Sequence, residues 1–169
     1  MHPQQRKKMN DFKVRLLEKQ KLRYSYWVSE RQFRNYVEDA FKKPGVKGET
    51  LISLLERRLD NIVYRLGFAP TLPAARQEVV HGHVMVNGRK VDRPSYLLRQ
   101  GDSVTLKEKS KKMLLVQDAL TRSMSRPVPS YLEVDKENLK GTLTGIPARD
   151  QIPLEVNEGL VMEHYTKYL

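Results

Sequence analysis

Residues 82–91 have the sequence Gly-His-Val-Met-Val-Asn-Gly-Arg-Lys-Val, and this stretch determines how the middle of the chain folds. Asn87-Gly88 lies between two apolar runs, and this dipeptide is a strong hairpin signal because both residues tolerate a positive φ. A second turn at Gly101-Asp102 leads into the alternating segment 103–106. The sequence therefore predicts a β-hairpin followed by a further strand.

Four helices are expected before this hairpin. They span about residues 11–24, 30–43, 50–66 and 72–81. Asn10, Ser29 and Thr71 are expected N-caps, since each has a side-chain oxygen that can accept a backbone N–H. Pro44-Gly45 and Gly67 end the second and third helices.

After the hairpin we expect a fifth helix and several short strands. The helix spans about residues 111–122, the strands lie near 131–134, 141–145 and 152–156, and a C-terminal helix begins near Asn157. This order predicts an α+β chain. We expect a basic helical domain at 1–50, with the helix at 157–169 packed on it, and a second domain at 51–156.

The chain has 169 residues and a strong excess of positive charge. It carries 31 Lys and Arg against 20 Asp and Glu, a net charge of +11. Residues 1–34 carry ten basic and three acidic side chains, and residues 35–122 carry sixteen and ten, whereas residues 123–169 carry five and seven. This distribution predicts that the first three quarters bind a polyanion. The acidic remainder is expected to face solvent, the basic elements of the chain or a protein partner.

Other classes of protein are disfavoured. No apolar run approaches the ~18 residues of a membrane span, so we expect a soluble protein with no membrane partner. The chain has no cysteine, which excludes disulfides and cysteine-ligated zinc. Two histidines, His81 and His83, are too few ligands for a metal site. No nucleotide-binding or nucleophile motif is present, so no enzyme activity, cofactor or small-molecule substrate is expected.

The expected third helix has two different faces. Its apolar face consists of Leu51, Leu55, Leu59, Ile62 and Leu66. The opposite face carries Arg57, Asn61 and Tyr64. It is flanked by Asp60 and Arg65, and Arg58 lies nearer the boundary between the faces. Such groups can bind phosphate, a base edge and a base ring. The alternative is a solvated helix face with an Asp60–Arg57 ion pair.

The next forty residues favour RNA over that alternative, because they add further polar groups to the same module. The added candidates are Arg76, Gln77, His81, His83, Asn87, Arg89 and Lys90. Three blocks in this order, residues 58–61, 75–77 and 82–88, closely resemble the S-four RNA-binding domain. The resemblance implies two helices packed on a small, mainly antiparallel sheet with hairpins.

The flanking segments resemble the bacterial-type family of small-subunit ribosomal proteins that contains this domain. The similar segments are residues 18–23, 30–34, 95–96, 108–112 and 156–165. Members usually carry a further basic segment upstream, with a cysteine zinc cluster in some, and this sequence begins where that segment would end. Many also have Arg-x-x-Ala-Arg where this chain has Leu72-Pro73-Ala74-Ala75-Arg76, so one phosphate contact is not expected. Pro70-Thr71-Leu72-Pro73 is reminiscent of cyanobacterial and plastid members.

This resemblance implies a primary binder of small-subunit rRNA at a multi-helix junction of the 5′ domain, acting early in assembly. It also implies a place near the mRNA entrance, contact with a neighbouring small-subunit protein and an influence on translational accuracy. Some members repress translation of their own mRNA. The expected location is a cytoplasmic ribosome, with a plastid ribosome as the alternative. Residues 150–169 are the candidate protein contact.

A second RNA surface is expected from the basic side chains near the N-terminus, which are Arg6, Lys7, Lys8, Lys13, Arg15, Lys19, Lys21, Arg23, Arg31 and Arg34. Three further RNA-binding candidates follow the segment 103–106: Lys109, Lys111 and Lys112. The alternative for the N-terminal group is a solubilising arm with solvated helix faces. Trp27, directly before the second helix, is expected to pack in the core.

Two other functions are consistent with an S-four domain. The first is an accessory domain of an RNA-modifying enzyme or tRNA synthetase, which would need a catalytic domain of well over a hundred further residues. The second is a free-standing RNA-binding stress factor, which would match the domain but not its flanks.

Overall fold

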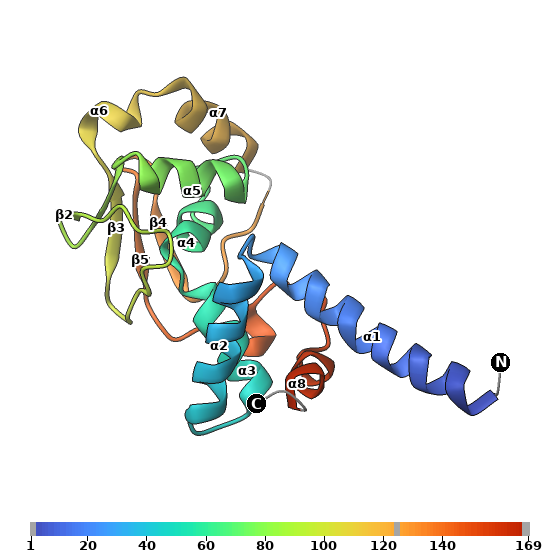
Figure 1. The fold of residues 1–169 in the computed structure, drawn as a ribbon. Coiled ribbons are helices and arrows are strands. Elements are labelled where there is room, and N and C mark those ends of the chain that lie inside the picture. The colour runs from blue at the N-terminus through green and yellow to red at the C-terminus, as the bar shows by residue number, and fades with distance from the viewer. Residues whose placement is uncertain (1–2, 124–125, 167–169) are drawn as a thin grey trace. The chain divides into compact units, whose positions relative to one another are not determined.

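The computed structural model describes residues 3–123 and 126–166, with side chains from residue 10 onward. Its contacts divide the chain into two compact units (Figure 1). The first unit consists of residues 1–54 and 154–169, and the second consists of residues 55–153. The α+β class predicted from the sequence is confirmed. Within the described residues, no helix is long and apolar enough to cross a membrane.

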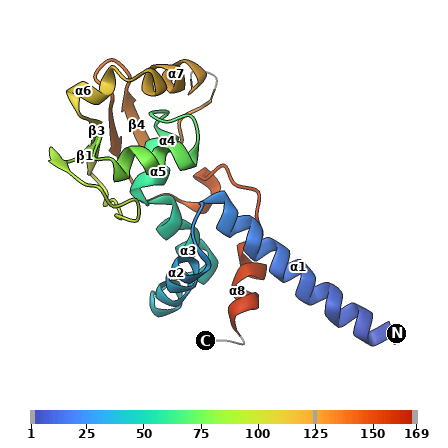
Figure 2. The same ribbon diagram turned by 45° about the horizontal axis from the view of Figure 1, so that its top comes forward.

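The first unit is helical. Its elements are α1 (Pro3–Ser25), α2 (Glu30–Lys42), most of α3 (Lys47–Glu56) and α8 (Glu158–Thr166). Helices α1 and α8 pack side by side, as both views show (Figures 1 and 2). The ring centroids of Phe12 and His164 lie 5.9 Å apart between them.

The N-cap expected at Ser29 is confirmed, and α8 begins directly after Asn157, close to the expected position. The Ser29 hydroxyl accepts the N–H of Gln32 at 3.2 Å, and the Asn157 amide oxygen accepts the N–H of Leu160 at 3.2 Å. The cap expected at Asn10 is wrong, because α1 continues back to Pro3. Nothing between these two residues breaks a helix, and proline is tolerated in the first turn.

The described residues of the second unit form a five-stranded antiparallel sheet and, besides the end of α3, four α-helices. The strands are β1 (Val84–Val86), β2 (Arg89–Lys90), β3 (Ser103–Leu106), β4 (Leu132–Asp135) and β5 (Lys140–Leu143), in the order β2-β1-β3-β5-β4. The helices are α4 (Leu59–Arg65), α5 (Leu72–Val80), α6 (Glu108–Lys111) and α7 (Leu114–Ser123). Both views show α4 and α5 lying together against the sheet (Figures 1 and 2).

The predicted hairpin is confirmed. Asn87 and Gly88 have φ angles of +51° and +81°, as a two-residue type I′ turn requires. Val84, Val86, Val104 and Leu106 alternate with more exposed residues along β1 and β3, and all four are buried. The predicted N-cap at Thr71 is also confirmed, since its hydroxyl accepts the N–H of Ala74 at 3.2 Å.

The expected single helix over residues 50–66 is wrong, because the chain forms two helices, α3 and α4, with an extended residue between them. Arg58 has a ψ of 141° and pairs in a β-bridge with Leu97. The N–H of Leu59 donates to the carbonyl of Tyr96 at 2.8 Å. Hydrogen bonds to the segment 94–98 therefore replace the helical ones at this point.

Two later expectations need correction. The helix expected at 111–122 begins instead at Leu114, after the separate short helix α6. The strand expected at 152–156 is absent from this described part of the chain, where a short 3₁₀ turn, Arg149–Gln151, is followed by irregular backbone. Residues 152–156 pair with no strand of the sheet, whose edge strands are β2 and β4, although Ile152 is buried and its neighbours alternate in exposure.

Gly141 on β5 fixes the packing of α4 on the sheet. A Cβ at this position would lie 2.3 Å from a methyl group of Leu66, which directly follows α4. Replacing Gly141 with alanine is therefore expected to destabilise the protein by about 1–3 kcal/mol through overpacking. Chemical unfolding should show this loss, whereas Gly145→Ala, where a Cβ meets open space, should change little. Equal stability of the two variants would contradict the packing described here.

Candidate nucleic-acid interface

The second unit buries part of its acidic charge and keeps most of its basic charge at the surface. The carboxylates of Glu56, Asp60 and Glu78 are buried, whereas Arg89, Lys90 and Arg99 are exposed. Within residues 55–123, the exposed or half-buried Arg57, Arg76, Arg89 and Arg99 have no ion pair with a carboxylate. The outer surface of this unit therefore carries positive charge that the protein does not neutralise itself, which suits a polyanion.

Arg58 and Asn61 do not belong to that outer surface, so their expected exposure is wrong. Arg58 is fully buried and pairs twice with Asp60, Nε to Oδ1 at 3.1 Å and Nη2 to Oδ2 at 3.0 Å. The Asn61 side chain donates to the carbonyl of Glu56 at 2.8 Å. Both residues stabilise the break between α3 and α4.

Arg65 and Tyr64 also have protein partners. The Arg65 Nε donates to Glu56 at 2.8 Å, and the Tyr131 hydroxyl donates to the same carboxylate, so Arg65 is only 17% exposed. Burial raises the pKa of Tyr131 far above its usual range, helped by the Glu56 charge and hydrogen bond. The Arg126 guanidinium lies 4.6 Å from the Tyr64 ring centroid. Arg65 and Tyr64 are half-buried rather than free on a helix face.

Arg57 and Arg99 form a pair of like charges. The Arg57 Nε donates to the carbonyl of Leu98 at 2.8 Å, which holds its guanidinium beside the loop that carries Arg99. Burial lowers the pKa of Arg57, and the nearby charge of Arg99 adds to that shift. Two guanidinium groups that repel each other favour an anion between them, and a phosphate is the expected one. Arg99 was not among the residues expected from the sequence, although it lies just before the turn at Gly101-Asp102.

A second polar cluster surrounds the start of β1. The His81 and His83 rings lie 6.3 Å apart, and His83 Nδ1 is hydrogen bonded to the Ser110 hydroxyl at 2.7 Å. The Lys90 side chain lies over Gly82, where a Cβ would be 3.3 Å from it. These contacts bring α5, the hairpin and α6 together.

The remaining RNA-binding candidates of this unit differ in their exposure and in their contacts with other side chains. Gln77, Lys109 and Lys112 are exposed or half-buried, and so is Arg76. Lys111 pairs with Glu108 at 2.7 Å. The Asn87 side chain is exposed but has structural partners: it donates to Asp102 at 2.9 Å and accepts the N–H of Ser103 at 2.9 Å. No cluster of three or more potential metal ligands occurs among the described residues.

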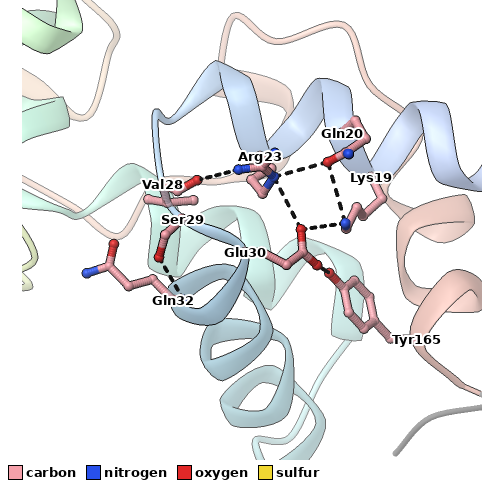
Figure 3. A network of polar contacts seen from close by, with 8 residues as sticks. All are labelled: Lys19, Gln20, Arg23, Val28, Ser29, Glu30, Gln32 and Tyr165. Atoms are coloured by element: carbon pink, nitrogen blue, oxygen red, sulfur yellow. Dashed lines mark hydrogen bonds and ion pairs between the residues drawn. The ribbon is translucent and has the colours of Figure 1, made fainter.

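In the first unit, a network around Glu30 occupies two of the expected RNA ligands (Figure 3). Lys19 is buried and pairs with Glu30, and the Arg23 Nε lies 3.3 Å from the same carboxylate. Tyr165 donates to Glu30 at 3.0 Å. Burial opposes ionisation of Glu30, but the Lys19 and Tyr165 hydrogen bonds and the neighbouring positive charges outweigh it and lower its pKa. Lys19 therefore ties α1 to α2, and its expected exposure is wrong.

Arg31 and Arg34 remain on the surface and line a hollow of about 560 Å³ together with Glu30, His164 and Tyr165. Burial and the positive charges of Lys19 and Arg15 lower the pKa of His164, against the opposing effect of Glu30. Lys21 is exposed, and Arg15 is half-buried. The side chains of Arg6, Lys7 and Lys8 lie outside the described residues.

Trp27 is on the surface, so its expected place in the core is wrong. Its side chain is 53% exposed, and its φ is +54°. Together with Arg23, Tyr24, Val28 and Ser29 it lines a shallow pocket of about 280 Å³.

Comparison with known proteins gives consistent matches over almost the whole chain. Residues 1–56 match the family model "Ribosomal protein S4/S9 N-terminal domain", and residues 57–104 match the model "S4 domain". The protein named small ribosomal subunit protein uS4 from Thermosynechococcus vestitus is 51% identical over 166 residues, which cover 98% of this chain and 82% of that protein. The proteins of the same name from Thermus thermophilus and from a Geobacillus species are 50% and 47% identical, over 98% of this chain and 80% and 82% of theirs.

Proposed function

The chain belongs to the family of small ribosomal subunit protein uS4, and on that basis we propose that it binds small-subunit rRNA through the unneutralised cations of both units. Family membership makes it a structural ribosomal protein rather than an enzyme. The observation that supports the RNA surface is the set of cations in the second unit that have no carboxylate partner. Glu56, Asp60 and Glu78 are buried, while Arg57, Arg99, Arg89 and Lys90 are left for phosphate.

We further propose that the protein binds early in assembly, at a multi-helix junction of the 5′ domain of the rRNA. Because the positive groups lie on folded elements, the protein stabilises one arrangement of the junction over its alternatives. Influence on translational accuracy and repression of its own mRNA are also proposed from the family resemblance. The proposed location is the cytoplasmic ribosome, with the plastid ribosome as the alternative.

The proposed protein partner is a neighbouring small-subunit protein, bound by the outer part of segment 150–166. The side of α8 that packs on α1 is unavailable, since Val161, Met162 and Tyr165 are buried. Glu155 and Glu163 are exposed and are the candidate contacts.

Hydroxyl-radical footprinting of small-subunit rRNA, with excess tRNA as competitor, tests the main proposal. Protection confined to one multi-helix junction is the expected result. Diffuse protection that tRNA abolishes would leave only a basic RNA-binding protein and would reopen the accessory-domain and stress-factor functions.

The salt dependence of rRNA binding tests the Arg57–Arg99 pair. Each of Arg57→Gln and Arg99→Gln is expected to weaken binding and to lower the slope of log K against log[salt] by about one phosphate contact. The matched control is Arg122→Gln, because Arg122 is 70% exposed and already pairs with Asp118 at 3.2 Å. Slopes that stay at the wild-type value in both variants would remove this pair from the RNA surface.

A further inference from the structure

Trp27 occupies a backbone position that normally belongs to glycine. Helix α1 ends in a Schellman motif: the N–H of Val28 donates to the carbonyl of Arg23 at 3.4 Å, and the N–H of Trp27 donates to that of Tyr24 at 3.2 Å. The residue at the position of Trp27 must have a positive φ, here +54°, which disfavours any residue with a bulky side chain. The ring does not compensate by full burial, since the side chain is 53% exposed.

Beside Trp27 lies a second exposed ring whose position is fixed. Tyr24 is 57% exposed, and the Arg23 guanidinium lies 4.4 Å from its ring centroid. Arg23 is itself held on three sides, by Gln20 Oε1 at 3.0 Å, the Val28 carbonyl at 3.1 Å and the Glu30 carboxylate (Figure 3). The arginine therefore supports Tyr24 instead of moving freely in solvent.

These residues share one pocket of about 280 Å³, which also includes Val28 and Ser29. Its volume lies just below the roughly 300–1,000 Å³ of pockets that enclose a whole small ligand, so it suits one planar group. Two aromatic rings, a guanidinium plane and a hydroxyl are the groups with which proteins hold unstacked bases. The surrounding segment 1–34 carries ten basic and three acidic side chains, which favours a polyanion over a neutral or basic partner.

We propose that Trp27 and Tyr24 form a stacking site for an unpaired RNA base. The site rests on the proposed rRNA binding and adds to it a recognition of single-stranded nucleotides. The stacking site also explains the strained backbone of Trp27. Its positive φ disfavours folding, and such a conformation is kept where the exposed ring contributes to binding.

Trp27 is the only tryptophan of the chain, so its fluorescence reports this position alone. A single-stranded RNA dodecamer and small-subunit rRNA are expected to quench its emission, while a blunt RNA duplex of equal charge leaves the emission nearly unchanged. Affinity for the dodecamer should fall roughly tenfold in Trp27→Gly and in Tyr24→Ala, and only slightly in Trp27→Phe. The salt slope should stay the same, because no charge is removed.

Glycine suits a positive φ, so Trp27→Gly is expected to fold with an unlowered thermal midpoint. Leu17→Ala is the matched control, since Leu17 is 57% exposed on α1 and lies outside the pocket. Wild-type affinity in Trp27→Gly, or RNA binding without quenching, would overturn the stacking site while leaving rRNA binding intact. If assembled subunits quench the emission but free rRNA does not, the Trp27 ring contacts a neighbouring protein. That result would also overturn the stacking site. Failure of the wild-type chain to bind rRNA would instead overturn the proposed function.

Discussion

Replacing Asp60 with alanine is expected to remove a large part of the stability of the second unit. The substitution removes the carboxylate that pairs twice with Arg58, whose side chain is fully buried. Loss of one partner of a buried ion pair costs about 3–5 kcal/mol, because the other charge stays buried without it. It also removes the acceptor of the Asn61 N–H at 2.7 Å. Since whole domains are stable by only about 5–15 kcal/mol, this is a large part of the total.

Urea unfolding followed by circular dichroism measures this loss. The matched control is Asp118→Ala, which breaks the exposed Arg122–Asp118 pair and should cost well under about 1 kcal/mol. The double variant Arg58→Met/Asp60→Leu should be more stable than Asp60→Ala, because it removes both charges together. If Asp60→Ala and Asp118→Ala unfold at the same urea concentration, the Arg58–Asp60 pair does not stabilise the break between α3 and α4.

The hairpin and the helix caps at Ser29 and Thr71 could be predicted because their causes are local. Asn87-Gly88 forms its turn through the backbone preferences of two adjacent residues. Ser29 and Thr71 need only a backbone N–H three residues away. Exposure of Arg89 and Lys90 follows from the same turn, so their place on the surface could be predicted as well.

The break after α3 could not be predicted, because its cause lies forty residues away. Residues 50–66 have the apolar spacing of one continuous helix, and its five apolar positions are indeed all buried. Only the backbone of residues 94–98, which is remote in the sequence, turns Arg58 into an extended residue. The extended conformation of Arg58 moves Arg58 and Asn61 inward. It also changes the face that α4 presents to solvent.

Trp27 was misplaced for a different reason. A tryptophan beside an N-cap usually packs in a core, and the apolar character of the residue favoured that interpretation. The position of Trp27 depends on where α1 ends, and element boundaries are the least reliable part of sequence interpretation. Once α1 is known to end at Ser25, the Schellman geometry places the residue at a positive φ.

Replacing Glu78 with leucine is expected to stabilise the protein, most strongly at alkaline pH. Glu78 lies on α5 with its side chain buried, and neither carboxylate oxygen has a hydrogen-bond partner among the described residues. Burial raises the pKa of Glu78 to about 8 from an ordinary value of 4.5. A carboxylate kept from water without a partner disfavours the folded state whenever it is ionised.

The sign of the pH dependence follows from this raised pKa. Between about pH 4.5 and pH 8 the folded chain holds the Glu78 proton while the unfolded chain has released it. The contribution of Glu78 to the free energy of unfolding should therefore be most favourable below pH 4.5. It should fall as the pH rises toward 8. Each pH unit costs up to about 1.4 kcal/mol, so the whole interval costs on the order of 4 kcal/mol.

Unfolding curves of wild type and Glu78→Leu between about pH 5 and about pH 8.5 measure this dependence. Their difference should be small near the lower limit and should grow to about 4 kcal/mol in favour of the variant near pH 8. Glu133→Leu on β4 removes the same formal charge from an exposed position and should leave the wild-type pH dependence in place. A Glu78→Leu variant that is less stable than wild type at the upper limit would mean that the buried carboxylate has a partner there. A difference that does not change with pH would show that Glu78 does not titrate in this range, so that only the shape of its side chain matters.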